Sequence, residues 1–422
     1  MAGRQALLPF PAAREAAPSG LALDLLRFRG FGKRTEEGLL RADSPEGLVE
    51  VPVYANEFWT ARQRAAHSLH EVSYRACFKP QLPRFFIERL TKPGERVYDP
   101  FMGRGTTLIE AGLLGRKPMG CDLNPLAELL AAPRFSPPTR EEVAGRLEGI
   151  DLKAAGEAPE DLLAFFHPDT LREISALRTH LLERKTPDAV DAWIRMVALN
   201  RLTGHSSGFL SVYTMPPNQA VSAQAQRKIN LKRGQTPPYR DLRAVLLKKT
   251  RSLLADWDPG FRMAKPVLLT ADAESTRGIR SGSVRLVVTS PPFLDVVDYT
   301  SDHWLRCWFA GIDPASVRLS AFRRVEDWQA KMRSVFRELR RVLAPGGHVA
   351  FEVGEVRGGK VRLEEAVIPA AVEAGLEPVL VLIHRQKFTK TANCWGVDNN
   401  LKGTNTNRVV LLRKPGASKT IP

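Results

Sequence analysis

Four consecutive residues, Ser290, Pro291, Pro292 and Phe293, have the chemistry to hold a flat ring that carries an amino group. They follow an apolar run at 284–289 that predicts a buried strand. Because prolines fix φ and donate no backbone hydrogen bond, this turn should be rigid, with its carbonyls and the Ser290 hydroxyl left as acceptors. Phe293 adds an aromatic face for stacking. Taken alone, the same residues also fit a plain loop that ends a strand.

A glycine loop further upstream indicates where a nucleotide would bind. Residues 97–107 predict a strand that runs into a loop with Gly103 and Gly105, and a helix follows. Glycines let a backbone approach a ligand closely, and the helix offers a positive N-terminus. The next strand, 117–122, ends in Asp122. A carboxylate roughly twenty residues past such glycines accepts hydrogen bonds from a ribose, so the series predicts an adenosine-containing cofactor.

The chain resembles the DNA amino-methyltransferases in two runs, Asp-Pro-Phe-Met-Gly-Arg-Gly-Thr-Thr at 99–107 and Thr-Ser-Pro-Pro-Phe at 289–293. Members of that family use S-adenosylmethionine to methylate cytosine N4 or adenine N6. The serine of the tetrapeptide is more similar to the N4-cytosine branch, because adenine enzymes more often carry Asp or Asn there. A third block, 78–90, resembles the motif that closes over the methionine end of the cofactor. The resemblance covers residues 70–135 and 266–413.

The resemblance implies roles for individual residues. Asp272, after the strand expected at 266–269, matches the acid that accepts from the adenine amine of the cofactor, and its alternative role is to cap the next turn. The tetrapeptide Ser290, Pro291, Pro292 and Phe293 is implied to be catalytic. The residues implied to bind the cofactor are Phe78, Lys79, Pro80, Asp99, Pro100, Phe101, Gly103, Gly105, Thr106, Thr107, Asp122, Leu123, Asn124, Asp272, Ala273 and Ser290.

Two features depart from the family pattern. Arg104 stands between the two loop glycines, where the family usually has serine, and it could contact the cofactor carboxylate, a DNA phosphate or water. The long insertion at 139–265 follows the second strand of the cofactor half, which is not the usual place for the family's DNA-recognition segment.

Composition is compatible with a nucleic-acid enzyme. The 422 residues include 62 Lys and Arg against 46 Asp and Glu, which gives a net charge of +16. A basic chain favours a polyanionic partner, although many soluble proteins are also basic. Its four cysteines are far apart, without a C-x-x-C pair, which argues against a zinc site or a disulfide framework and suits a reducing cytoplasm. No apolar run is long enough to predict a membrane span, and the N-terminus lacks a signal-peptide pattern.

The chain divides into three parts. Residues 1–65 predict an irregular N-terminal extension, partly ordered by Phe58 and Trp59, whereas 66–138 and 266–415 predict the S-adenosylmethionine-dependent catalytic domain. In the second part a helix at 325–343, a Pro-Gly-Gly turn and a strand at 348–353 precede two strands, 378–384 and 408–412, expected to pair. The alternation of strands and helices predicts an α/β fold with a mostly parallel doubly wound sheet. The resemblance implies that this is the Rossmann-like fold of a class I methyltransferase.

The third part, 139–265, predicts a largely helical insertion and a candidate DNA-recognition region. Helices are expected where Leu171, Ile174, Leu177 and Leu181 recur, with Asp169 as the cap, and at 189–202 and 242–257. The segment 203–240 between the last two is rich in polar and basic residues that could contact phosphates and base edges, or form a solvated loop. Its candidate DNA-binding residues are Asn218, Gln219, Arg227, Lys228, Lys232 and Arg233. The loop 388–407 is a second candidate for contacting the target.

The resemblance and the tetrapeptide chemistry imply a site-specific DNA methyltransferase acting on cytosine N4 after base flipping. Acceptors at Ser290 and Pro291 would hold the amine hydrogens, and Phe293 would stack on the base. Among later residues, Asp298 or Tyr299 could line the base pocket. No Pro-Cys pair occurs, which argues against cytosine C5 methylation. The alternatives are DNA N6-adenine methylation, methylation of an RNA amine and a non-catalytic nucleic-acid-binding protein. The expected partners are double-stranded DNA and, as the resemblance allows, a cognate restriction endonuclease.

Overall fold

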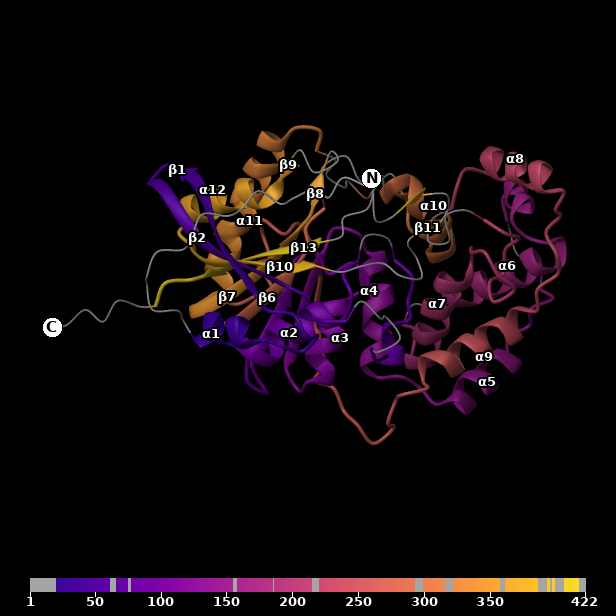
Figure 1. Ribbon diagram of the computed structural model, residues 1–422. Helices are drawn as coiled ribbons and strands as arrows, with labels where there is room; N and C mark the ends of the chain where they lie inside the picture. The colour runs from indigo at the N-terminus through magenta and orange to yellow at the C-terminus, as the bar shows by residue number, and fades with distance from the viewer. Residues whose placement is uncertain are drawn as a thin grey trace.

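The computed structural model describes most of the chain in two lobes, one built on a sheet and one built of helices (Figure 1). The described residues are 20–60, 66–74, 77–154, 158–184, 186–214, 220–292, 299–314, 317, 322–356, 361–385, 393–394, 397–398 and 406–416.

A nine-stranded sheet forms the core of the first lobe, in the order β1-β2-β10-β13-β7-β6-β3-β4-β5. Its centre is parallel: β3 (Arg96–Asp99), β4 (Lys117–Asp122), β5 (Val267–Thr270), β6 (Val284–Thr289) and β7 (Leu343–Val353) all run the same way. The strand β13 (Thr406–Arg413) runs antiparallel between β7 and β10 (Glu377–Arg385). From the neighbouring strands β3 and β6, later parallel strands are added in opposite directions: β4 and β5 beside β3, and β7 beside β6. A crevice is therefore expected at the carboxyl ends of β3 and β6.

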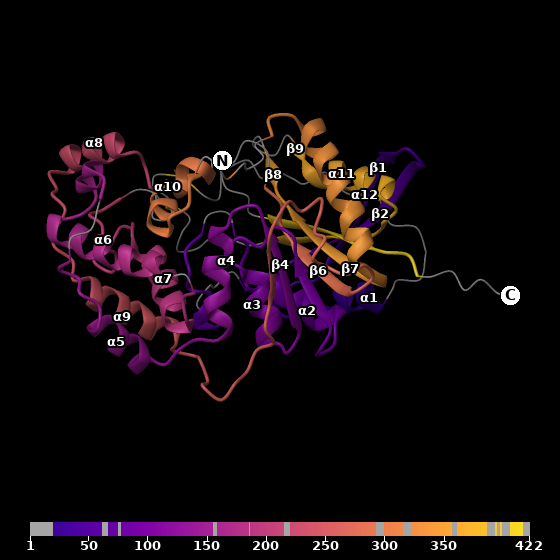
Figure 2. The ribbon, with the colours of Figure 1, turned by 180° about the vertical axis from the view of Figure 1, so that it is seen from behind.

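Helices cover both faces of this sheet (Figure 2). On one face lie α11 (Val325–Val342) and α12 (Leu363–Glu373), and on the other α1 (Gly20–Arg27), α2 (Gln81–Leu90) and α3 (Thr106–Leu113). The buried residues of α11 recur at helical spacing and pack on the sheet: Trp328, Met332, Val335, Phe336 and Leu339. This doubly wound arrangement confirms the predicted fold class.

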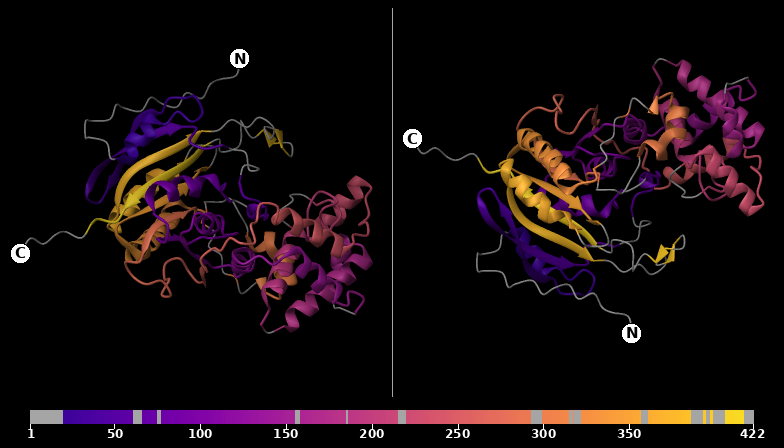
Figure 3. Two further views of the ribbon diagram at one scale, coloured as in Figure 1. Left: turned by 90° about the horizontal axis from the view of Figure 1, so that it is seen from below. Right: turned by 90° about the horizontal axis from the view of Figure 1, so that it is seen from above.

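The second lobe contains the helices of the insertion (Figure 3). Its main elements are α5 (Arg140–Glu148), α6 (Pro168–Glu183), α7 (Ala189–Arg201), α8 (Ala223–Arg233) and α9 (Leu242–Leu253). A short α4 (Leu126–Ala131) joins it to the sheet lobe, with 3-10 turns at Ser68–His70, Ala132–Phe135 and Glu160–Ala164. The helix α10 (Tyr299–Ala310) follows β6 in the chain but packs on α6 and α7. The short strand pairs are β8 (Glu355–Val356) with β9 (Val361–Arg362) and β11 (Asn393–Cys394) with β12 (Val397–Asp398).

Several local predictions hold and others need correction. The predicted pairing of the last two long strands is confirmed, because β10 and β13 form an antiparallel pair. The prediction of an irregular N-terminal extension is wrong for its described part: β1 (Glu36–Ser44) and β2 (Gly47–Asn56) form a hairpin that extends the main sheet through β10. The predicted turn at 344–347 lies within β7, where Gly346 has a φ of 70° and the pairing with β6 shifts in register.

The helical lobe also differs in detail from its prediction. Leu171, Ile174, Leu177 and Leu181 are buried on α6 as predicted, but the N-cap of this helix is His167, whose ring accepts from the backbone N–H of Asp169. Asp169 itself lies in the first turn, so its predicted capping role is wrong. The segment predicted without clear periodicity contains α8, which has Ser222 as its N-cap and Gly234 as its C-cap.

Candidate active site

A cleft of about 930 Å³, open to solvent, lies where β3, β4, β5 and β6 end. The structure brings together in its lining twelve residues that the sequence singled out: Phe78, Asp99, Pro100, Phe101, Gly103, Thr106, Asp122, Leu123, Asp272, Ala273, Ser290 and Pro292. Seven further residues complete the lining: Tyr74, Cys77, Met102, Ala271, Phe322, Lys331 and Met332. The glycine loop and the diproline corner therefore share one cleft, although nearly two hundred residues separate them in the sequence.

The glycine loop is held against the end of β4 by Asp122. The backbone N–H groups of Gly103 and Asn124 donate to the two carboxylate oxygens of Asp122 at 2.8 and 2.9 Å. Gly103 and Gly105 adopt φ values of 47° and 76°, which residues with a Cβ atom rarely adopt. Burial raises the pKa of Asp122 to about 6. A carboxylate has about four acceptor positions, so Asp122 can bind these two donors and still accept from the hydroxyls of a ribose.

Asp99 ties the first strand of the site to the diproline corner. The Thr289 hydroxyl donates to Asp99 at 2.6 Å, and the Phe101 N–H donates to the same oxygen at 3.1 Å. Burial raises the pKa of Asp99 to about 7. The Thr107 hydroxyl donates to the Val288 carbonyl at 3.0 Å, which links α3 to β6. These contacts place Ser290 at a fixed position relative to the glycine loop.

The diproline corner is supported by two residues that the sequence analysis did not single out. The buried Glu352, in β7, hydrogen-bonds to the Ser290 side chain and accepts from the Asn407 amide at 2.9 Å, and burial raises its pKa. The fully buried Trp328 donates from its indole N–H to the Pro292 carbonyl at 2.9 Å. The sequence does carry a signal for Glu352, which is a carboxylate within the otherwise apolar second half of β7. A buried carboxylate needs specific partners, so its place in an apolar strand indicates a specific contact.

Asp272 caps a turn, as one of its expected roles requires, and also lines the cleft, so its expected contact with the cofactor stays a prediction. It lines the cleft, and one of its carboxylate oxygens accepts from the Glu274 N–H at 3.0 Å, as a turn cap does. Its other oxygen accepts from Lys331 at 2.8 Å. The side chain of Asp272 is 38% exposed, so it remains accessible to a ligand.

Other predicted site residues, five for the cofactor and the catalytic candidate Pro291, lie outside the cleft lining. Pro80 precedes α2, and Gly105 precedes α3. The side-chain oxygen of Asn124 accepts from the Leu126 N–H at 3.0 Å at the start of α4. The remaining members of this group are Lys79, Thr107 and Pro291.

Arg104 has a structural role that the sequence did not predict. Its side chain is 6% exposed and donates to the backbone carbonyls of Val72 and His70 at 2.7 and 3.3 Å. Its burial favours this internal role over the three contacts considered for it, with the cofactor carboxylate, a DNA phosphate or water. Arg104 instead fixes the segment 66–74 next to the glycine loop.

The candidate DNA-binding residues divide into three groups. Lys228 and Lys232 are exposed on α8, and Arg233 lies over the Tyr213 ring at 3.8 Å. Arg227 is exposed but forms an ion pair with Asp161. The other two DNA-binding candidates, Asn218 and Gln219, lie outside the described residues. So do Phe293 of the tetrapeptide and Asp298, a candidate for the base pocket. The side chain of Tyr299 and most of the loop 388–407 are also outside the described residues.

Comparison with known proteins gives a family match within the cofactor half. Residues 38–132 match the protein-family model N6_N4_Mtase, described as DNA methylase. This segment resembles a DNA methylase. It includes β2 to β4, the glycine loop and Asp122, so the match supports an amino-methyltransferase. The sheet order, with the reversed β13 between β7 and β10, is that of a Rossmann-like class I methyltransferase.

Three curated relatives share parts of the chain. The Type II methyltransferase M.MjaII of Methanocaldococcus jannaschii is 37% identical over 70 residues, which is 17% of this chain and 13% of that protein. A tRNA (guanine(10)-N2)-dimethyltransferase of the same organism is 30% identical over 118 residues, 24% of this chain and 34% of that protein. The Type II methyltransferase M.BsoBI of Geobacillus stearothermophilus is 22% identical over 304 residues, 64% of this chain. The chain spans 13%, 34% and 58% of the lengths of these relatives.

Solved structures that match the chain do so with low TM-scores. A putative DNA modification methylase from Thermus thermophilus, complexed with S-adenosyl-L-methionine, is 23% identical over 36% of this chain and 56% of that chain, with a TM-score of 0.23. A SAM-dependent methyltransferase from Methanosarcina mazei is 11% identical over 78% of this chain and 97% of that chain, with a TM-score of 0.32.

The cofactor supported by the family match is S-adenosylmethionine, and the cleft fits it. Asp122 and Asp272 offer carboxylate acceptors at the ends of neighbouring strands, and the glycine loop lies between Asp122 and Ser290. Among the described side chains, no cluster of His, Cys, Asp and Glu could hold a metal ion. No helix in the described part of the chain is long and apolar enough to span a membrane.

Proposed function

We propose that the chain is a DNA methyltransferase that transfers a methyl group from S-adenosylmethionine to the exocyclic N4 amine of cytosine in duplex DNA. One observation carries the proposal: the glycine loop and the Ser290–Pro292 corner line the same cleft. The cofactor supplies a methyl group already activated on a sulfonium. The residues of the cleft therefore need to orient the amine and stabilise the charge that develops on it.

Ser290 is positioned to hold the amine of the target base. Because its hydroxyl can donate to Glu352, its oxygen lone pairs remain free to accept a hydrogen from the amine. Trp328 and the prolines keep the corner rigid, so the acceptor does not need to reorganise during the reaction. After transfer, the amine nitrogen carries one proton too many, and that proton can pass through Ser290 to Glu352.

Duplex DNA fits the charge of the chain, and the cleft is open to an extruded base. The net charge of +16 favours a polyanion, and exposed Lys228 and Lys232 on α8 can neutralise phosphates. An exocyclic amine inside a duplex cannot reach a cleft, so the base must leave the stack. The cleft is open to solvent beside both the glycine loop and the diproline corner, which is where an extruded base would enter.

The choice of base rests on the residue at the head of the tetrapeptide. Ser290 offers a neutral hydroxyl, which resembles the N4-cytosine branch of the family. The alternative is DNA N6-adenine methylation, in which the same cleft would hold adenine in place of cytosine. Methylation of an RNA amine is a further alternative, because one relative is a tRNA guanine-N2 methyltransferase.

The proposal is tested by incubating the purified protein with S-adenosylmethionine and duplex DNA of mixed sequence, then digesting the DNA to nucleosides for mass spectrometry. We expect N4-methylcytosine in the digest. N6-methyladenine alone would overturn the base assignment. Methylation of tRNA or rRNA with none in DNA would overturn the substrate assignment.

A further inference from the structure

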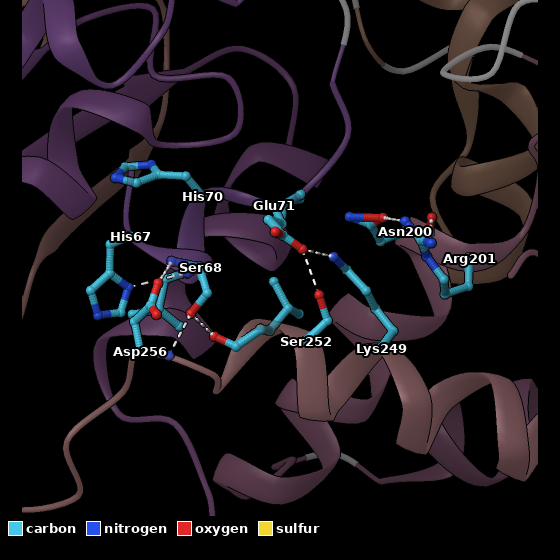
Figure 4. Close-up of polar contacts among 12 residues, drawn as sticks. His67, Ser68, His70, Glu71, Asn200, Arg201, Lys249, Ser252 and Asp256 are labelled. Carbon is cyan, nitrogen blue, oxygen red and sulfur yellow. Dashed lines mark hydrogen bonds and ion pairs between the residues drawn. The ribbon is translucent and has the colours of Figure 1, made fainter. Parts of the chain in front are cut away.

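Three cationic side chains meet where the helical lobe joins the sheet lobe. Arg201 ends α7, Lys249 lies on α9 and Arg306 lies on α10. Lys249 bonds to Glu71 and Arg306 to Ser73, both in the segment 66–74 that leads into the cofactor cleft, and the charge of Arg201 helps to lower the pKa of Glu71. Figure 4 shows part of this junction, with Glu71 between Lys249 and Ser252 and Arg201 on the neighbouring helix. We call Arg201, Lys249 and Arg306 the junction cations.

The junction cations have few anionic partners. Lys249 bonds to a carboxylate oxygen of Glu71 at 3.1 Å, and the Ser252 hydroxyl donates to the same oxygen at 2.5 Å. Glu71 is the carboxylate that the described residues provide to this cluster. Its side chain is 50% exposed.

The two arginines bond to neutral oxygens. The Arg201 guanidinium donates to the Asn200 carbonyl at 3.1 Å and to the Asn200 side chain at 2.5 Å, and it lies 4.1 Å from the centre of the Phe209 ring. The Arg306 guanidinium donates to the Ser73 carbonyl at 3.1 Å. Its Nη1 atom is buried and has no hydrogen-bond partner among the described residues.

Burial makes this excess of positive charge costly. The Arg306 side chain is 7% exposed and that of Lys249 is 8% exposed. Desolvation lowers the pKa of Lys249 to about 8 and that of Arg201 to about 10, and the charge of Arg306 lowers the pKa of Arg201 further. Taking an unpaired charge out of water costs several kcal/mol, so such a cluster is stabilised when an anion joins it. Arg201 is partly exposed and leaves a side from which an anion can approach.

The cluster adjoins the cofactor cleft. Ser73, which binds Arg306, precedes Tyr74, and Tyr74 lines the cleft. The Tyr74 ring packs edge-on against the ring of His303 on α10, with centroids 4.9 Å apart. An anion at the junction cations would therefore lie beside the part of the cleft wall that Tyr74 forms.

We propose that the junction cations bind a backbone phosphate of the DNA strand whose base enters the cleft. The inference rests on the proposed function, and it assigns to the α7–α9–α10 junction a phosphate contact separate from the exposed cations of α8. Arginine suits this role because its planar guanidinium can donate two parallel hydrogen bonds to a phosphate. Occupancy of the site would also bridge α7 of the helical lobe to α10, the helix that follows the diproline corner.

The test compares Arg201→Gln and Arg306→Gln with a matched control, Arg195→Gln. Arg195 lies on the same helix as Arg201 and also donates to a backbone carbonyl, that of Leu181, but is not part of the cluster. Binding of a fluorescent DNA duplex is measured by anisotropy at several salt concentrations, with the full-length protein and saturating S-adenosylmethionine. We expect each junction variant to bind roughly tenfold more weakly, with a salt slope shallower by about one. The control should match the wild type.

Four further measurements decide the outcome. Calorimetry of S-adenosylmethionine binding should be unchanged in all variants, which shows that the cleft is intact. If the wild type methylates DNA but the junction variants keep its affinity and salt slope, the inference is overturned while the proposed function stands. If the wild type neither binds nor methylates DNA, the proposed function itself fails. If the junction variants bind duplex RNA more weakly but bind DNA as the wild type does, the DNA assignment is overturned. If inorganic phosphate stabilises the wild type against heat but the junction variants bind DNA normally, the site binds free phosphate only and the inference is overturned.

Discussion

The acids around the cleft have different partners from the buried acids in the rest of the protein. In the helical lobe, Asp191 is fully buried and is matched by two arginines, Arg146 and Arg184, the latter at 2.7 Å. In the sheet lobe, the buried acids Glu110 and Glu364 likewise have arginine partners, Arg84 and Arg408. Around the cleft, by contrast, Asp99, Asp122 and Glu352 bond to hydroxyls, an amide and backbone N–H groups, and no lysine or arginine among the described residues bonds to them. Burial raises the pKa of all three.

This difference separates acids that hold the fold together from acids that are available to a ligand. A buried carboxylate matched by arginines has its charge and its acceptor positions taken up by side chains of the protein. A buried carboxylate bonded to neutral donors has a perturbed pKa and keeps free acceptor positions, and such groups cluster at functional sites. The comparison assigns Asp191 to the stability of the fold, and Asp99, Asp122 and Glu352 to the function of the cleft. The predictions below test that assignment.

The largest effect is expected from Asp191→Ala. Removing this carboxylate deprives two arginines, which are partly exposed and keep Asp188 nearby, of their buried partner. Losing these two charge-assisted hydrogen bonds costs about 3 kcal/mol of unfolding free energy. Urea unfolding followed by circular dichroism measures the loss. The control is Glu183→Ala, an exposed acid of α6 that should change stability by about 0.5 kcal/mol or less. A loss below about 1 kcal/mol in Asp191→Ala would contradict the structural role of this acid.

The second prediction concerns Asp122→Ala and the affinity for the cofactor. This change removes the proposed ribose acceptor and leaves the N–H groups of Gly103 and Asn124 without a partner, so we expect S-adenosylmethionine to bind about 100-fold more weakly, or about 2.7 kcal/mol. Calorimetry measures the change. Asp122→Asn keeps one acceptor and should lose less, and Glu128→Ala, an exposed acid on α4, serves as the control. Unchanged affinity in Asp122→Ala would remove Asp122 from the cofactor site.

The parts of the site that could be predicted from the sequence are those fixed by local pattern. Asp99, Asp122 and Ser290 each follow a short apolar strand, and parallel strands bring their carboxyl ends to one edge of the sheet. The doubly wound fold could be predicted for the same reason, because strand and helix alternate through the cofactor half.

The parts that could not be predicted depend on contacts between distant segments. Glu352 meets Ser290 only because β7 lies beside β6, and Trp328 reaches Pro292 from a helix on one face of the sheet. Likewise, β2 joins the sheet by pairing with β10, more than three hundred residues away in the chain. Arg104 was expected at a ligand because glycines flank it, but its long side chain reaches back to carbonyls of the preceding segment. The helix α8 has one buried residue, Gln226, so its signal was the caps Ser222 and Gly234 rather than apolar periodicity.

The third prediction concerns Ser290→Ala and the rate of methyl transfer. This change removes the acceptor proposed for the target amine and leaves Glu352 with Asn407 as its partner. We expect kcat to fall about tenfold with little change in the KM for DNA, because the contact strengthens as charge develops on the amine. Methyl transfer from labelled S-adenosylmethionine to duplex DNA measures both constants. Thr289→Ser keeps the hydroxyl bonded to Asp99 and is the matched control. A rise in KM with unchanged kcat would make Ser290 a binding residue only.

The smallest effect is expected in the pH dependence of stability. Burial raises the pKa of Asp99 from its usual value near 4 to about 7, so between these values the folded state binds more protons than the unfolded state. The contribution of Asp99 to stability is therefore present in full below pH 4 and is lost as the pH rises through 7. In Asp99→Asn this loss disappears, and we expect the fall in unfolding free energy between pH 6 and 7 to be about 1 kcal/mol smaller than in the wild type. Urea unfolding at half-unit pH steps measures the slopes, and Asp43→Asn, an exposed acid of the hairpin, should keep the wild-type slope. An identical slope in Asp99→Asn would mean that this carboxyl titrates as an ordinary acid. The contrast between acids matched by arginines and the acids around the cleft would then rest on Asp122 and Glu352 alone.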